Sequence, residues 1–184
     1  LDADPYPVVD GGKVLWVIDA FTTTSRYPYA QQANTDNLTA GSGLKHNFNY
    51  VRNSVKAVVN AYDGSVVLDV VDPTDPIVMA WSKAFPGTVK PKSAISKDLL
   101  SHIRYPEDLF RVQRDILSSY HVKDAASFYG GQDFWRVPSD PSTFGGNAGV
   151  QPPYYLTLKL PNQKEPAFSL TTPFVPRGVR ENLT

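Results

Sequence analysis

The sequence predicts an α+β fold, with an antiparallel sheet built from hairpins and a block of short helices packed on it. Apolar runs that alternate every second residue occur in pairs, and turn signals separate the members of two pairs. The middle of the chain instead repeats its apolar residues at helical spacing. With 184 residues and 41% hydrophobic content, the chain is large enough to bury one core, so we expect a single domain over residues 1–184.

The first expected hairpin joins residues 6–9 to residues 13–21 through Asp10-Gly11-Gly12. The second of its strands is apolar on both faces, with Trp16 on one and Val17 on the other. Such a strand is usually internal to its sheet and covered on both sides.

The second hairpin, residues 55–72, carries the strongest signal. Asp63-Gly64 favours a two-residue loop, which pairs Val59 with Leu68. One face is then wholly apolar, and we expect it to face the core: Val55, Ala57, Val59, Ala61, Val66, Leu68 and Val70. The opposite face, which includes Lys56, is expected to be solvated.

The sequence also predicts two long polar loops and a third hairpin. Residues 30–49 and 138–153 are rich in loop-forming residues. Residues 154–160 and 167–173 alternate apolar side chains, which suggests a last hairpin with one buried face.

Helix signals cluster between the second and third hairpins. Asp75-Pro76 supplies an N-cap and an N1 proline, Ser96 caps a short helix, Pro106 opens a longer one, and Asp124 caps a single turn. The first helix is expected to bury an apolar stripe of Ile77, Ala80, Trp81 and Ala84.

Composition excludes several classes of function. Lys+Arg and Asp+Glu are both 18, so the net charge is zero and nothing indicates a basic stripe that would bind a nucleic acid. With no Cys, disulfides and thiolate sites are excluded. The longest strongly apolar run, residues 14–18, is too short to span a bilayer. We expect this segment to be soluble and, because it starts at Leu1 rather than Met, to be cut from a longer protein.

No metal or cofactor is expected. G-x-S-x-G, P-loop and G-x-G-x-x-G motifs are missing from the sequence. The histidines do not stand at helical ligand spacing: His46, His102 and His121. Asp69, Asp72 and Asp75 recur every three residues, but Pro73 and Pro76 interrupt what would have to be a calcium loop.

A polar cluster directly after the first buried strand is the first candidate site. It runs from Asp19 to Tyr27 and includes Arg26. Asp19 interrupts an apolar strand and needs a partner, for which Arg26 is the nearest cation in sequence. The cluster is either structural, as an ion pair or a threonine-rich turn, or it is a small polar binding site at the sheet edge.

Aromatic residues near the proline-rich loops are the second candidate. Trp135 and Tyr154, together with Tyr27, either line a ligand or peptide groove or form amphipathic edges of the core.

Several strings together resemble uncharacterised protein family 0182. They cover nearly the whole chain in order: DPYPVV (4–9), WVIDAFTTTSRYPY (16–29), NYVRNSVKAVVNAYDG (49–64), RYPEDLFRVQ (104–113), FYGGQDFWRVP (128–138), PPYYL (152–156) and SLTTPFVPR (169–177). The family comprises large bacterial integral membrane proteins. The resemblance implies a parent protein in the cell membrane, with this segment in its extracytoplasmic region, and it brings no catalytic residue.

The expected function is therefore a non-catalytic extracytoplasmic module that serves interaction, sensing or envelope transport. Its partner would be an envelope protein, a peptide, or a lipid or glycan. The alternative is a cell-envelope enzyme of hydrolase type, with Asp19 or Glu107 as the acid/base. A deep pocket holding paired carboxylates would favour the enzyme, and an aromatic groove or flat apolar patch would favour the binding module.

Overall fold

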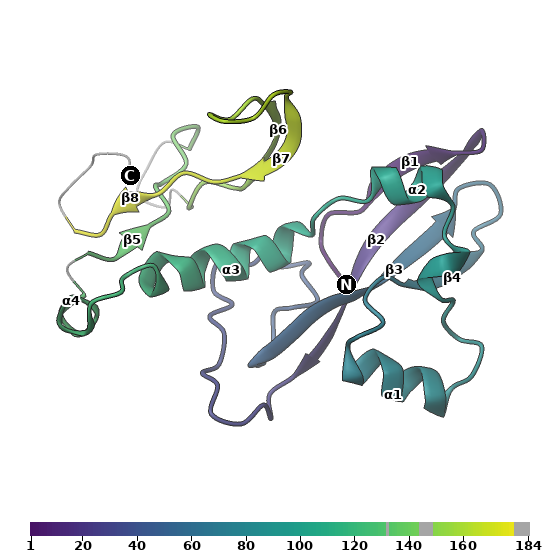
Figure 1. Ribbon diagram of the computed structural model, residues 1–184, viewed down its shortest axis with the longest axis horizontal. Coiled ribbons are helices and arrows are strands. Elements are labelled where there is room, and N and C mark those ends of the chain that lie inside the picture. Colours follow the sequence, from purple (N-terminus) through teal and green to yellow (C-terminus); the bar gives the residue numbers. More distant parts are fainter. Residues whose placement is uncertain (132, 144–148, 179–184) are drawn as a thin grey trace. The chain divides into compact units, whose positions relative to one another are not determined.

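The computed structural model describes residues 1–131, 133–143 and 149–178 (Figure 1). It divides the chain into two compact units, which we call unit 1 (Leu1–Leu109) and unit 2 (Phe110–Thr184). Antiparallel sheets with a few helices confirm the α+β class. The expectation of one domain stays a prediction, and each unit is described by itself.

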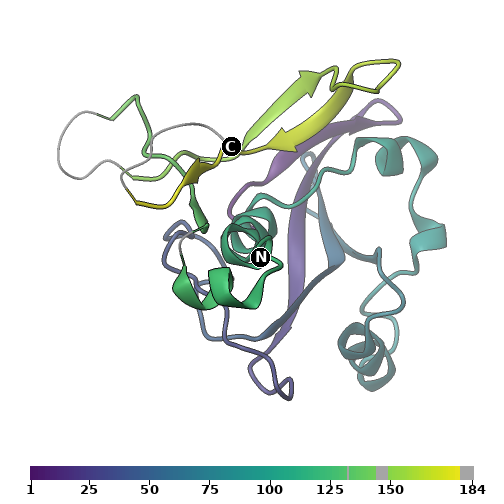
Figure 2. The same cartoon turned by 60° about the vertical axis from the view of Figure 1, so that its left-hand side comes forward.

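Unit 1 is built on a four-stranded antiparallel sheet in the order β1-β2-β3-β4. Its strands are β1 (Tyr6–Asp10), β2 (Lys13–Thr24), β3 (Tyr50–Asn60) and β4 (Val66–Val70). The helices that follow are α1 (Pro76–Ala84), the 3₁₀-helix η1 (Lys92–Ala94) and α2 (Lys97–His102). Figure 2 shows the sheet closer to edge-on, with α2 and η1 on the same side of it.

The core of unit 1 lies between one face of this sheet, which we call the core face, and the segment around α2. Val17 of β2 and Val58 of β3 are cross-strand neighbours on this face, and Ile95 and Leu99 pack against them. β2 is internal to the sheet, as its two apolar faces predicted. The core face uses the residues of β3 that the sequence assigned to solvent.

The register of the second hairpin is therefore a correction. Val59 pairs with Val66 and Ala57 with Leu68, a shift of two residues from the expected pairing. The loop spans residues 61–64, because the Asn60 backbone N–H still donates to the Ser65 carbonyl oxygen. Gly64 takes a positive φ of 71° while Asp63 does not, so the turn with two positive φ angles does not form. A two-residue shift leaves each side chain on its own face, but Lys56 lies on the core face and is buried.

Helix caps agree with the sequence better than helix faces do. Asp75 caps α1, with Pro76 in its first turn, and Ser96 caps α2. In α1 the buried residue is Val78, whereas Trp81 is exposed and stacks on Phe85. The expected stripe through Trp81 is therefore wrong by about one residue's rotation of the helix.

α3 (Glu107–Tyr120) starts in unit 1 and continues in unit 2. Unit 2 also contains α4 (Ala125–Gly130), capped by Asp124, and the strands β5 (Trp135–Arg136), β6 (Tyr154–Leu158), β7 (Ala167–Thr171) and β8 (Val175–Pro176). β6 pairs with β7 and β5 with β8. The β6–β7 hairpin confirms the third pair of strands, but its apolar residues divide between both faces, so the single buried face is wrong. Part of the loop expected at residues 138–153 lies outside the described residues.

Candidate functional site

Lys56 and Asp19 form an ion pair beneath the surface of unit 1. They are direct cross-strand neighbours on β3 and β2, and only 2% of Lys56 and 1% of Asp19 is exposed. The Lys56 ammonium also lies 3.3 Å from the carbonyl oxygen of Arg104 and donates to it. The structure thus confirms that Asp19 is paired, but its partner is Lys56 rather than Arg26.

Burial and pairing act on the two pKa values in opposite directions. Burial raises the pKa of the Asp19 carboxyl, and the Lys56 ammonium opposes this rise. Burial lowers the pKa of Lys56, and Asp19 opposes that fall. Asp69 of β4 lies opposite Lys56 on its other side, and burial raises its pKa as well.

A second pair of acids stands near Asp19. The Asp2 carboxylate accepts hydrogen bonds from the backbone N–H groups of Asp4 (2.9 Å) and Asp108 (3.0 Å), and Asp108 accepts one from Ala3 (3.1 Å). Burial, and then the neighbouring Asp108 carboxylate, raise the pKa of Asp2 to about 6. These bonds tie the start of the chain to the first turn of α3.

Above Lys56 lies a pocket of about 580 Å³, which we call the basic pocket. Its polar lining residues include Lys56 of β3, Lys92 of η1 and Arg104, which follows α2. The other lining residues are Asn53, Val71, Leu100, Ile103, Tyr105 and Pro106. This lining contains three cationic residues and no acidic one, and it combines them with apolar side chains.

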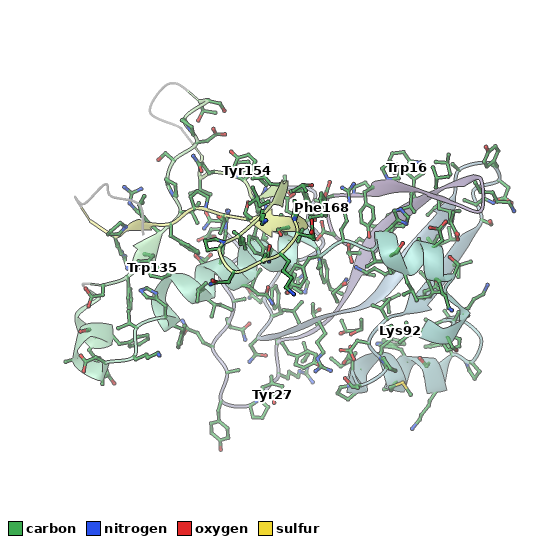
Figure 3. All side chains as sticks on the ribbon, turned by 45° about the horizontal axis from the view of Figure 1, so that its top comes forward. Trp16, Tyr27, Lys92, Trp135, Tyr154 and Phe168 are labelled. Atoms are coloured by element: carbon green, nitrogen blue, oxygen red, sulfur yellow. The ribbon has the colours of Figure 1, made fainter. Side chains whose placement is uncertain are left out.

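Of the cations that line the basic pocket, Arg104 is held in place by two contacts with Tyr6. The Arg104 guanidinium lies over the Tyr6 ring, 4.7 Å from its centroid, and the Arg104 backbone N–H donates to the Tyr6 hydroxyl at 3.0 Å. Lys92 is exposed, and among the described residues it makes no ion pair. Lys92 (labelled in Figure 3) also lines a second, more apolar pocket of about 440 Å³ next to Val70 and Met79.

Asp75 is the centre of a separate polar cluster with a structural role. Its carboxylate caps α1 and accepts hydrogen bonds from Tyr50 (2.8 Å), Ser54 (2.5 Å) and Thr22. Burial acts to raise the pKa of Asp75, but these hydrogen bonds outweigh it and hold the pKa below its ordinary value. The cluster ties α1 to β2 and β3.

The two other candidates from the polar cluster lie at the surface. Arg26 is exposed, and its backbone N–H donates to Thr24 Oγ1 at 3.1 Å. Tyr27 is exposed and stacks on Tyr50, with ring centroids 5.7 Å apart. Neither residue lines the basic pocket, whereas Asp19 forms an ion pair with Lys56, which does line it.

The two candidates in unit 2 belong to different aromatic contacts. Trp135 stacks on His121, with centroids 3.5 Å apart, and also approaches Phe174 at 5.4 Å. Tyr154 is exposed on β6, where its carbonyl oxygen accepts from Thr171 Oγ1 at 3.1 Å. Both residues are labelled in Figure 3. Trp135 thus has the environment of a core edge, and no pocket described here includes either residue.

The acid/base and metal candidates do not assemble in the described part of the chain. Glu107 lies in the first turn of α3 and lines neither pocket. Within residues 1–131, 133–143 and 149–178, no group of three or more His, Asp or Glu residues is placed to hold a metal ion. Asp72 binds Thr74 and Arg52, while Asp75 caps α1.

Sequence comparison places the chain in a family. The profile described as "Uncharacterised protein family (UPF0182)" matches residues 1–184. The chain belongs to this family. A UPF0182 protein of Streptomyces coelicolor is 50% identical over 100% of the chain, one of Thermobifida fusca is 52% identical over 100%, and one of Kocuria rhizophila is 49% identical over 96%.

The chain spans only 19% of the length of each of these UPF0182 relatives. No solved structure matches it. Among the described residues, no helix has the length and apolar character needed to cross a membrane.

Proposed function

We propose that this chain is a non-catalytic, extracytoplasmic binding module of a UPF0182 membrane protein, and that its basic pocket receives the anionic headgroup of an envelope lipid. The observation that carries the proposal is the lining of the pocket, in which Lys56, Lys92 and Arg104 are joined by no acidic residue. Cationic side chains over a partly apolar wall match a phosphate attached to a hydrocarbon body.

The buried ion pair determines which of these cations contribute most of the charge of the pocket. Asp19 largely neutralises Lys56 from behind, so the charge that faces a ligand comes mainly from Lys92 and Arg104. A site of this kind binds one or two negative charges without bringing an acid or base to them. The pocket volume of about 580 Å³ lies within the range of small-ligand sites.

The enzyme alternative has less support. A general acid or base must reach the reacting atoms, and Asp19 is covered by its bond to Lys56. Asp2 lies beside the Asp108 carboxylate and has the raised pKa that an acid requires, but neither residue lines a described pocket. Their partners are backbone N–H groups, which gives them a structural role.

Titration with short-chain lipids tests the proposal. Dihexanoyl phosphatidylglycerol, kept below its micelle concentration, should bind, and binding should weaken as salt is raised because the cations are screened. The zwitterionic dihexanoyl phosphatidylcholine should bind about tenfold more weakly, since it offers no net charge. Glycerol phosphate separates the charge from the hydrocarbon and should also bind more weakly. Equal binding of the two lipids would contradict the proposal.

A further inference from the structure

The face of the unit 1 sheet opposite the core face is apolar across all four strands. One cross-strand row joins Pro7, Trp16, Val59 and Val66. Val9 and Val14 flank this row on one side, and Ile18, Ala57 and Leu68 on the other. We call these nine residues the outer apolar patch. It contains no charged or polar side chain.

Much of this patch is open in the structure. Val9 is 61%, Val66 58% and Trp16 42% exposed, and of the nine residues only Ala57 is buried. Trp16 is labelled in Figure 3. An antiparallel sheet with one solvated face normally carries polar residues there, so a face without any is built to be covered.

We infer that the outer apolar patch docks against another part of the same UPF0182 polypeptide. The chain spans 19% of the length of these relatives, so most of each relative's polypeptide lies outside the matching segment. A permanent interface resembles a domain core cut in half and tolerates an uncharged centre. An anionic membrane surface, in contrast, is recognised by Lys and Arg, and the patch contains neither.

Cysteine labelling of the full-length protein tests this inference, because the chain itself has no Cys. Val66→Cys and, independently, Val9→Cys report on the patch. Tyr62→Cys is the matched control, since Tyr62 lies in the loop of the same β3–β4 hairpin and is 76% exposed. Substituting Cys for Val changes little volume, and two patch positions guard against a variant that fails to fold.

In the folded full-length protein, N-ethylmaleimide should react about tenfold or more slowly at positions 66 and 9 than at position 62, with the rates equal after denaturation. Equal rates in the folded protein would overturn the inference. Protection that disappears on dilution would assign the patch to a second copy, and protection that requires added lipid vesicles would assign it to a membrane surface. Either of these results also overturns docking within the chain.

Discussion

The Lys56 ammonium of β3 and the Asp19 carboxylate of β2 are joined inside unit 1, where only 3% and 2% of the two side chains are exposed. Each ion loses its hydration in this position, so each depends on the other. Lys56, but not Asp19, also lines the basic pocket. Lys56 therefore belongs both to this structural ion pair and to the pocket of the proposed function.

Breaking this pair should be costly. Lys56→Met leaves the Asp19 charge buried without its partner and should lower the free energy of unfolding by about 3–5 kcal/mol. Replacing both residues, Asp19→Leu with Lys56→Met, should recover most of that loss, because no charge is then buried. Urea denaturation of the single and double variants measures the coupling. Lys13→Met, at an exposed position, should change the free energy by no more than about 0.5 kcal/mol. A single variant as stable as Lys13→Met would mean that the pair is not buried as described.

The Asp75 cap should contribute more than an ordinary helix cap. Asp75→Ala removes the cap of α1 and also leaves the donors of Thr22, Ser54 and Tyr50 without their acceptor, so we expect a loss of about 2–4 kcal/mol. Ser96→Ala removes the cap of α2 in the same unit, together with one exposed hydrogen bond to Asp10, and should cost about 1 kcal/mol. Thermal or urea unfolding compares the two variants. Equal losses would show that the cluster adds nothing to capping.

The raised pKa of Asp2 predicts a specific dependence of stability on pH. Between the ordinary value of 3.8 and about 6, the folded chain holds a proton on Asp2 that the unfolded chain has released. This contribution to stability is complete below about pH 4 and is lost as the pH rises through about 6.

Asp2→Asn should remove that decline while keeping an oxygen acceptor. Unfolding free energies measured from pH 4 to pH 7 would show it. Asp63→Asn serves as a contrast, because hydrogen bonds from Ser65 lower the pKa of Asp63 and its contribution has the opposite sign. An unchanged pH profile in Asp2→Asn would contradict the assignment.

The proposed placement outside the cytoplasm has its own test. Ala40 is exposed in the loop between β2 and β3, and the chain has no Cys. In the full-length protein, Ala40→Cys should react with a membrane-impermeant maleimide in intact cells, above the unsubstituted control. Reaction only after the cells are broken open would place this segment in the cytoplasm.

Local signals in the sequence predicted the strands and the caps well. An N1 proline after Asp75 and a Ser at position 96 act within a few residues, so one sequence is enough to recognise them. Asp63-Gly64 likewise located a turn, but it did not give the length of the loop or the register of the hairpin. The choice of the covered sheet face depends on what packs there, and alternation alone does not reveal it. The face with Lys56 carried a charge and was therefore assigned to solvent, although Asp19 accommodates that charge inside.

The candidate site was predicted only in part. Asp19 was identified because it interrupts an apolar strand, which is a local observation. Lys92 and Arg104 come from separate segments after β4, and only the fold brings them to the pocket above Lys56. The cross-strand pairing of Asp19 with Lys56 is the signal that could have led from Asp19 to Lys56, and from there to the pocket.

The affinity of two charge-matched variants for dihexanoyl phosphatidylglycerol tests the central claim most directly. Lys92→Ala removes a cation from the basic pocket, and Lys97→Ala removes one from an exposed position on α2 that lines neither described pocket. Calorimetric titration should show about a tenfold loss of affinity for Lys92→Ala, the equivalent of one lost charge-assisted hydrogen bond, and less than about a twofold change for Lys97→Ala. Equal affinities in the two variants would show that the lipid headgroup does not bind in this pocket.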